Sequence, residues 1–81
     1  MKTLTDVVAD RILKYLGENN MTQYRLAQKS GLPKETIKSI MRRQTKNVTL
    51  KTIMMICEGF GITLLEFLDD ESFKPENLDL E

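Results

Sequence analysis

Residues 22–42 read TQYRLAQKSGLPKETIKSIMR, and this stretch decides how the chain folds. Its apolar residues recur at intervals of three and four, as on α-helices, and Gly31 separates two short helices because glycine closes a helix without steric cost. Ala27 is small enough to let these helices approach closely, while Ile37 and Ile40 fasten the second helix to a core. The spacing predicts a helix-turn-helix unit, whose second helix enters the major groove of DNA. An ordinary helical hairpin is the alternative interpretation.

The remaining sequence also has helical spacing, and no window alternates as a β-strand does. We expect five short helices, over about residues 5–17, 22–30, 33–43, 50–60 and 63–68. Thr22 is a good N-cap, Gly17 is expected to end the first helix, and Thr63 and Glu66 form the capping-box pattern. The fourth helix is expected to bury Leu50, Ile53, Met54, Ile56, Cys57 and Phe60. Helices this short are unstable alone, so we expect an all-α domain in which they pack together.

The net charge of zero hides an uneven distribution along the chain. Residues 1–51 hold eleven Lys and Arg against four Asp and Glu, whereas residues 52–81 hold Lys74 against eight acids. A basic half joined to an acidic tail is typical of proteins that bind a polyanion such as nucleic acid. Solvated surfaces of opposite sign are the simpler alternative, but the helix-turn-helix unit lies in the basic half and favours DNA.

The composition excludes several classes of protein. A chain of 81 residues is expected to form one small domain, without a separate domain for a small-molecule effector. It has no His, which excludes His-based catalytic triads and zinc fingers, and it has no phosphate-binding loop or cluster of metal ligands. We therefore expect no enzymatic activity, no metal and no cofactor. Cys57 has no partner for an internal disulfide and no apolar run could span a membrane, so a cytoplasmic location is expected.

The chain resembles the lambda-repressor-like, XRE-type helix-turn-helix family of bacterial and phage regulators. The residues that match the family pattern are Thr22, Gln23, Leu26, Ala27, Gly31, Thr36, Ile37, Ile40, Thr49, Leu50, Ile53, Ile56, Cys57, Phe60, Gly61, Ile62, Thr63, Phe67 and Leu68. The resemblance implies a compact five-helix DNA-binding domain over residues 1–68 that binds operator DNA, typically as a dimer. The acidic tail, residues 69–81, lies outside the resemblance, and Phe73, Leu78 and Leu80 are its candidate anchors.

The second helix of the unit is expected to turn its polar face outward. With Ile37 and Ile40 directed inward, a rotation of about 100° per residue places the polar side chains on the opposite side. The family pattern assigns base contacts to Lys34, Glu35, Lys38 and Ser39. A lysine can donate to guanine, Glu35 can accept from cytosine N4, and Ser39 can serve either role. The alternative for Glu35 is that it only favours the positive N-terminus of its helix.

Contacts to DNA phosphates are expected from two places. Backbone N–H groups are free at the start of the first helix of the unit, and a basic loop follows the second helix. The candidates are Thr22, Gln23, Thr36, Arg42, Arg43, Lys46, Asn47 and Lys51. Members of the family commonly have glycine near Arg43, so the resemblance does not set the path of this loop. A solvated loop is the alternative.

These features together predict a sequence-specific transcription regulator that binds a palindromic operator as a homodimer through the helix over residues 33–43. The family resemblance favours a repressor, and an activator is the alternative. One helix reads few base pairs, so two half-sites about 34 Å apart would supply the remaining specificity. The candidate dimer surface comprises Leu64, Leu65, Phe67, Leu68, Phe73 and Leu78. The alternative for these residues is that they close the core of the monomer. An alternative function is an antitoxin-type regulator whose acidic tail also binds a protein partner.

Overall fold

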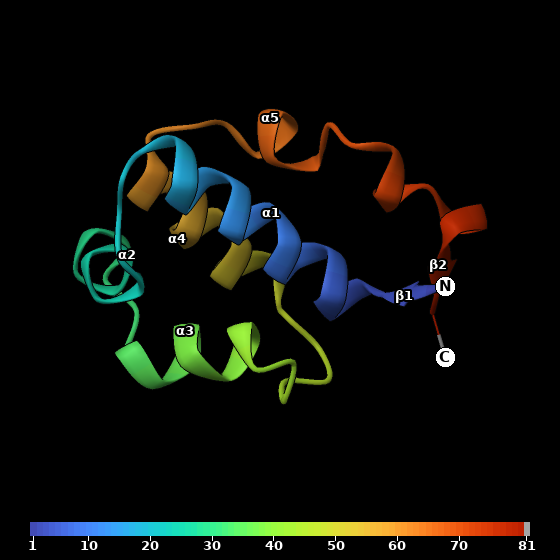
Figure 1. The fold of residues 1–81 in the computed structure, drawn as a ribbon, viewed down its shortest axis with the longest axis horizontal. Coiled ribbons are helices and arrows are strands. Elements are labelled where there is room, and N and C mark those ends of the chain that lie inside the picture. The colour runs from blue at the N-terminus through green and yellow to red at the C-terminus, as the bar shows by residue number, and fades with distance from the viewer. Residues whose placement is uncertain (81) are drawn as a thin grey trace.

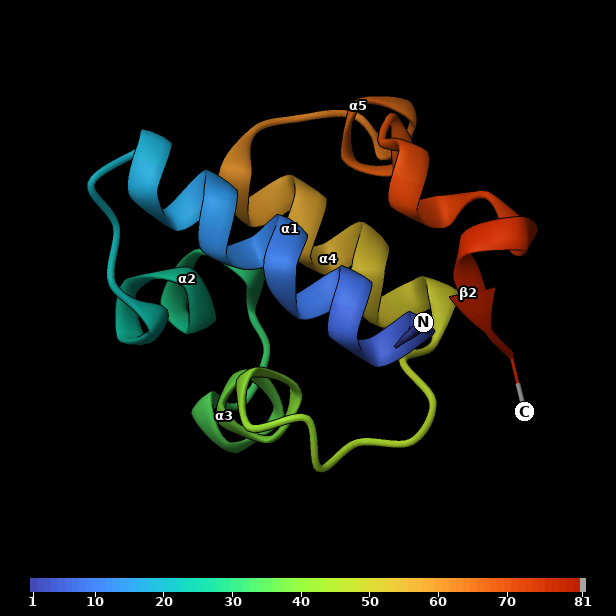
Figure 2. The same ribbon diagram turned by 45° about the vertical axis from the view of Figure 1, so that its right-hand side comes forward.

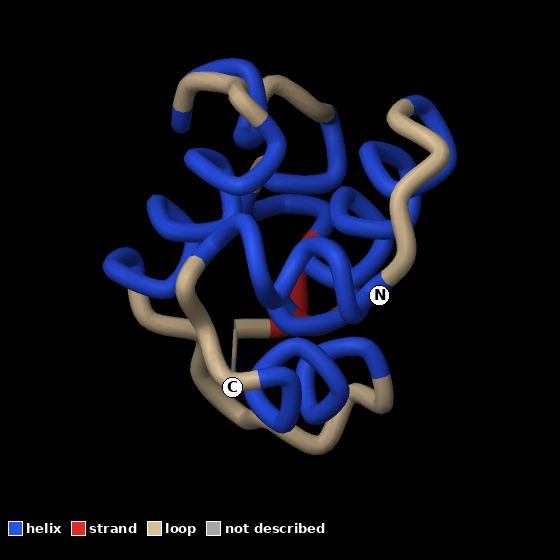
Figure 3. Tube along the Cα trace, turned by 90° about the vertical axis from the view of Figure 1, so that its left-hand side faces the viewer, coloured by secondary structure: helices blue, strands red, loops and turns tan. Residues whose placement is uncertain are grey.

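The computed structural model describes residues 1–80, and most of this part of the chain is helical (Figure 3). Its helices are α1 (Leu4–Glu18), α2 (Gln23–Ser30), α3 (Lys34–Met41), α4 (Leu50–Phe60) and α5 (Leu64–Leu68). The predicted all-α architecture of five helices is confirmed. Helices α1 and α4 lie alongside each other, with α3 on one side of the pair and α5 on the opposite side (Figure 1, Figure 2). No helix within residues 1–80 combines the length and apolar character needed to cross a membrane.

Threonine side chains cap the N-termini of most helices. The capping residues are Thr3, Thr22, Thr49 and Thr63. The Thr22 hydroxyl accepts a hydrogen bond from the backbone N–H of Arg25 at 3.1 Å, which confirms the predicted N-cap of α2. Thr63 and Glu66 each accept from the other's backbone N–H at 3.1 Å, which confirms the predicted capping box. Helix α3 starts directly after Pro33, whose ψ of 142° is extended rather than helical.

Left-handed residues follow each of the first four helices. Gly31 closes α2 with a φ of 78° and Gly61 closes α4 with a φ of 72°, as glycine does most readily. The prediction that Gly17 ends the first helix is wrong, because α1 continues through it to Glu18. Asn20 supplies the left-handed conformation there, with a φ of 53°. Asparagine tolerates this region better than most side chains, so the chain turns without needing a glycine.

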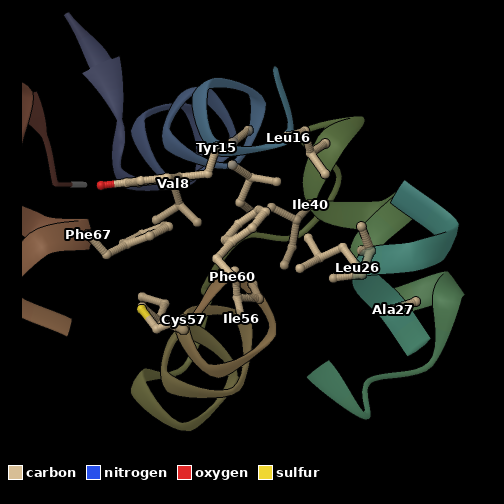
Figure 4. Packing of buried hydrophobic residues seen from close by; sticks show 14 residues of the cluster. Val8, Tyr15, Leu16, Leu26, Ala27, Ile40, Ile56, Cys57, Phe60 and Phe67 are labelled. Carbon is tan, nitrogen blue, oxygen red and sulfur yellow. The ribbon is translucent and has the colours of Figure 1, made fainter. Parts of the chain in front are cut away.

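The core lies between α1, α4 and α5 and continues beneath the helix-turn-helix unit (Figure 4). Phe67 of α5 has no exposed surface, and its ring centroid lies 6.3 Å from that of Tyr15. The Tyr15 ring in turn lies 5.5 Å from that of Phe60. Burying a large side chain contributes about 1.5–3 kcal/mol, so these aromatic residues hold α5 onto α1 and α4.

Helix α2 packs closely on α4 at Gly59. A Cβ atom built at Gly59 would lie 3.0 Å from Leu26 Cδ1 and 3.2 Å from the backbone nitrogen of Ser30. The absence of a side chain therefore lets the backbone of α2 approach α4. Because α3 follows α2 across the short turn at Gly31, this contact also helps to set the position of α3 relative to the core.

The acidic tail folds back on the domain. It forms two short 3-10 helices, Glu71–Phe73 and Pro75–Asn77, and then strand β2 (Leu78–Asp79). Strand β2 pairs in parallel with β1 (Lys2–Thr3), and these two short segments are strands that the sequence did not predict. Of the three expected anchors, Leu78 is buried and Phe73 packs against the core, whereas Leu80 is exposed. Glu81, the last residue of the predicted tail, lies outside the described residues.

Arg11 joins the tail end of the molecule to α1. Its guanidinium donates to the backbone oxygen of Phe67 at 2.7 Å and to that of Glu66 at 2.8 Å. The same group lies 3.6 Å from a carboxylate oxygen of Asp70. Its side chain is buried, and these acceptors satisfy the buried charge where α5 ends.

Candidate nucleic-acid interface

The outer face of α3 presents charged side chains that are free within the protomer. Ile37 and Ile40 point inward and are each 1% exposed, as their spacing predicts. Lys34, Glu35 and Lys38 are exposed, and no residue in the described part of the chain forms a hydrogen bond or ion pair with their side chains. Helix α3 lies at the edge of the molecule, so this face is open to a large ligand (Figure 2).

Ser39 stands at the border of this face. Its hydroxyl lies 2.7 Å from that of Thr45, in the loop that follows α3, and its side chain is half-buried. The structure therefore brings Lys34, Glu35 and Lys38 together and links Ser39 to the loop. A serine hydroxyl can donate one hydrogen bond and accept two, so Ser39 retains capacity for a further partner.

The N-terminus of α2 is exposed beside this face. Thr22 and Gln23 are both exposed, and the Thr22 hydroxyl already caps the helix. The first backbone N–H groups of a helix have no partner inside the helix, and the positive end of the helix dipole lies at the same place. This end of α2 is therefore chemically suited to an anion. Thr36, a further candidate for a phosphate contact, is half-buried on α3.

The loop between α3 and α4 begins with a non-glycine residue in the left-handed conformation. The N–H of Gln44 donates to Ser39 O at 3.0 Å and the N–H of Arg43 donates to Ile40 O at 2.9 Å, which is the Schellman closure of a helix. Arg43 occupies the left-handed position of this motif with a φ of 57°. Glycine prefers that position, and a side chain there costs about 1 kcal/mol or more.

The Arg43 side chain turns towards α1. Its Nη2 lies 2.9 Å from Asp10 Oδ1, its Nε lies 3.5 Å from Asp6 Oδ1, and its Nη1 donates to Met41 O at 2.7 Å. Lys2 also forms an ion pair with Asp10, and their hydrogen bond raises the pKa of Lys2. Hydrogen bonds from Thr3, through its N–H first and then its hydroxyl, lower the pKa of Asp6. Sequence reasoning missed both aspartates, because no local pattern joins them to Arg43, which follows Asp10 by 33 positions and Asp6 by still more.

A second contact fixes the same loop. The hydroxyl of the buried Thr5 donates to the backbone oxygen of Thr45 at 2.8 Å and lies 3.3 Å from that of Lys46. The side chains of Lys46 and Asn47 remain exposed and, among residues 1–80, have no hydrogen-bond or ion-pair partner. Arg42 and Lys51 are exposed in the same way at the two ends of the loop. Of the four cations among the predicted phosphate contacts, Arg42, Lys46 and Lys51 are thus unpaired in the described part of the chain, and Arg43 differs from them.

The predicted dimer surface is divided by the structure. Phe67 and Leu78 are buried within the protomer, so they are not available to a partner; Leu64, Leu68 and Phe73 are half-buried, and Leu65 is 80% exposed. The predicted burial of Leu50 and Met54 is wrong, because these side chains are 58% and 54% exposed. They line two adjoining shallow hollows on α4, which share Met54 and Glu58 and extend to Ile62 and Leu64. We call Leu50, Met54, Ile62 and Leu64 the α4 patch.

The fold and the exposed face of α3 define a helix-turn-helix protein, and the chain belongs to the Cro/C1-type HTH DNA-binding domain family, which residues 11–72 match. Control protein C.SmaI of Serratia marcescens is 29% identical over 73 residues, which cover 90% of this chain and 86% of that protein. The wild-type restriction-modification controller protein C.Esp1396I has a similar structure, with 32% identity and a TM-score of 0.77 over 85% of this chain and 88% of that one. Prophage Lp1 protein 11 aligns over 98% of this chain and 100% of its own, with 29% identity and a TM-score of 0.78. The resemblance found in the sequence is confirmed, and the protein is a DNA-binding transcription regulator of the XRE type.

Proposed function

We propose that this protein is a repressor that binds a palindromic operator as a homodimer, with α3 of each protomer in the major groove. The observation that carries the proposal is the group of exposed, unpaired side chains of Lys34, Glu35 and Lys38 among the described residues of α3. Charged side chains with no partner in the protomer are free to pair with base edges. The names of the controller proteins to which it is similar extend the proposal to the genes of a restriction–modification system.

Base recognition is assigned to the outer face of α3. Lys34 and Lys38 can donate to guanine O6 and N7, and Glu35 can accept from cytosine N4. Ser39, linked to Thr45, can contact a base while the loop holds its hydroxyl in place. Phosphate contacts are assigned to polar groups around this face, of which Thr36 is half-buried and the others are exposed. They are Thr22, Gln23, Thr36, Arg42, Lys46 and Asn47.

The α4 patch is the proposed contact between protomers. Monomeric proteins rarely expose a contiguous apolar surface without a function, and this one adjoins the DNA-binding half. Lys51 and Glu58 lie on either side of Met54 on α4. If two copies of α4 pack antiparallel about a two-fold axis at Met54, each Lys51 meets Glu58 of the partner subunit, so the face is complementary to itself. We therefore assign Lys51 to the contact between protomers and not to a DNA phosphate.

The alternative of a protein partner bound through the acidic tail has less support. Of its three proposed anchors, Phe73 and Leu78 pack against the protomer and only Leu80 is exposed, and Asp70 pairs with Arg11. A partner would have to displace these contacts before it could use the same side chains.

Selection from random duplex DNA, followed by measurement of stoichiometry on the selected site, tests the proposal. We expect an inverted repeat with half-sites about 34 Å apart and two protomers bound per site. Transcription in vitro from a promoter that overlaps this site should fall as protein is added. A selected site without symmetry that binds one protomer would contradict the homodimer, and increased transcription would contradict repression.

A further inference from the structure

We propose that Arg43 is a positioning residue rather than a phosphate contact. Together with Asp6 and Asp10 it forms a latch that ties the loop after α3 to α1 and so places Lys46 and Asn47 against the DNA backbone. The proposal rests on the proposed function, in which this loop meets DNA. It replaces the expectation from the sequence that Arg43 itself binds phosphate.

The first argument is that the guanidinium already has partners. Its Nη2, Nε and Nη1 are directed at Asp10, Asp6 and the backbone oxygen of Met41, at 2.9, 3.5 and 2.7 Å respectively. Lys46, next to the loop turn, is exposed like Arg43 but has no partner within residues 1–80. A phosphate contact by Arg43 would require these bonds to be broken, whereas one by Lys46 would not.

The second argument comes from the backbone. Arg43 occupies a left-handed position with a φ of 57°, where a glycine would close α3 with less strain. The guanidinium forms two ion pairs with carboxylates of α1, which a glycine could not form. Thr5, on the same turn of α1 as Asp6, adds a hydrogen bond to Thr45 O at 2.8 Å. Two side-chain contacts from one end of α1 therefore hold consecutive parts of the loop.

The third argument concerns charge. Asp6 and Asp10 belong to the basic half of the chain and lie beside a loop that faces a polyanion in the proposed complex. Their carboxylates would repel phosphates if left unpaired. Arg43 and Lys2 are their cationic partners in the described structure, so the cluster is neutral overall. Arg43 thus removes a local repulsion at the same time as it fixes the loop.

A charge exchange tests the latch. Arg43→Asp places a carboxylate beside Asp6 and Asp10 and should weaken binding to the selected operator about tenfold. Combining it with Asp10→Arg restores an ion pair of opposite polarity and the net charge of the native chain, and should recover binding to within about threefold. The matched control combines Arg43→Asp with Glu18→Arg, at the far end of α1, which restores net charge without a latch and should not recover binding. If the exchanged pair stays as weak as this control, Arg43 acts at the phosphate and the proposal fails.

A second variant separates the latch from closure of the helix and covers poor folding of Arg43→Asp. Arg43→Gly relieves the left-handed backbone, so Tm should stay close to that of the native protein while operator affinity falls about tenfold. Native affinity in this variant would overturn the proposal.

The rate of amide hydrogen exchange at residues 45–47 measures, in the absence of DNA, whether the latch holds the loop. Exchange should quicken in Arg43→Gly and return towards the native rate in the exchanged pair. If the native chain selects no DNA sequence, the proposed function fails, and the latch is then judged by exchange alone: unchanged rates would refute it.

Discussion

The cations around α3 and the acids around α5 and the tail are used differently. Lys34, Lys38 and Lys46 have no partner in the described part of the chain. By contrast, Glu66 completes the cap of α5, and Asp70 accepts from the N–H of Ser72 at 3.0 Å and pairs with Arg11. One set of charges stabilises the fold and the other is available to a ligand. The comparison shows that, in a chain of zero net charge, pairing rather than composition locates the binding face.

Among the exposed surfaces, the α4 patch is where a substitution is expected to have the largest effect. Met54→Glu places a carboxylate at the proposed two-fold axis and should leave the protein monomeric. Because a dimer gains from binding two half-sites at once, we expect operator affinity to fall about 100-fold or more. Sedimentation and operator titration measure both changes. Leu13→Glu, on another helix and 49% exposed, is the matched control and should alter neither.

Arg11 tests whether the paired charges around α5 and the tail stabilise the fold. Arg11→Met keeps the apolar stem but removes the donors to Phe67 O and Glu66 O. We expect a loss of about 2–4 kcal/mol in the free energy of unfolding, because the buried backbone oxygen of Phe67 is left without its donor, whereas that of Glu66 still accepts from Asp69 N–H and Tyr15 OH. Denaturant titration measures this loss. Arg25→Met, at an exposed position of α2, should lose far less; equal losses would show that the buried pairing contributes nothing specific.

Glu35 is an acid on the outer face of α3, where the charged side chains have no partner in the protomer. Glu35→Gln should reduce discrimination at one base pair of the operator by about 1–3 kcal/mol, since an amide no longer selects for a cytosine N4 donor. Affinities for a set of single-base operator variants measure the change. Glu76→Gln, in the tail, is the control. A preference that survives Glu35→Gln intact would leave this residue only its interaction with the helix N-terminus.

Lys46 tests whether an unpaired cation contacts phosphate. Lys46→Ala should weaken binding to all sequences a few-fold and reduce the slope of log affinity against log salt by about one. Lys74→Ala removes a cation that pairs with Glu71 at 2.8 Å and should leave the slope unchanged. Equal slopes for the two variants would mean that the unpaired and paired lysines do not differ in function.

The smallest expected effect is the dependence of stability on pH at Asp70. Hydrogen bonds from Ser72, through its N–H first, hold the pKa of Asp70 below its ordinary value of 3.8. The carboxylate therefore stabilises the folded state above about pH 3.8, and this stabilisation is lost as pH falls through the lower pKa of the folded protein. Asp70→Asn should flatten this part of the acid unfolding profile. An identical profile would show that Asp70 does not contribute.

Local signals in the sequence predicted much of the fold, and the remainder depends on distant contacts. The caps at Thr22 and Thr63 and the turn at Gly31 act within a few residues, so their chemistry is visible in the sequence. The outward direction of Lys34, Glu35 and Lys38 also follows from one helical wheel. Whether they touch bases stays a prediction.

The errors arose where partners are far apart or a helix has two apolar sides. The orientation of Arg43 depends on Asp6 and Asp10, which no spacing rule connects to it. Leu50 and Met54 share a helix with buried residues, and periodicity alone could not show that they face away from the core. Strands as short as β1 and β2 carry no alternating pattern that could be recognised.

Gly59 has a consequence for the geometry of the proposed dimer. Helix α2 packs on α4 at this glycine, where an added Cβ atom would lie 3.0 Å from Leu26 Cδ1. The proposed contact with the partner protomer is on the same helix. In the proposed dimer, a methyl group added at Gly59 would push α2, and α3 with it, away from the two-fold axis. The distance between the two α3 helices, and therefore the spacer length of the proposed operator, would then depend on the absence of a side chain at this one position.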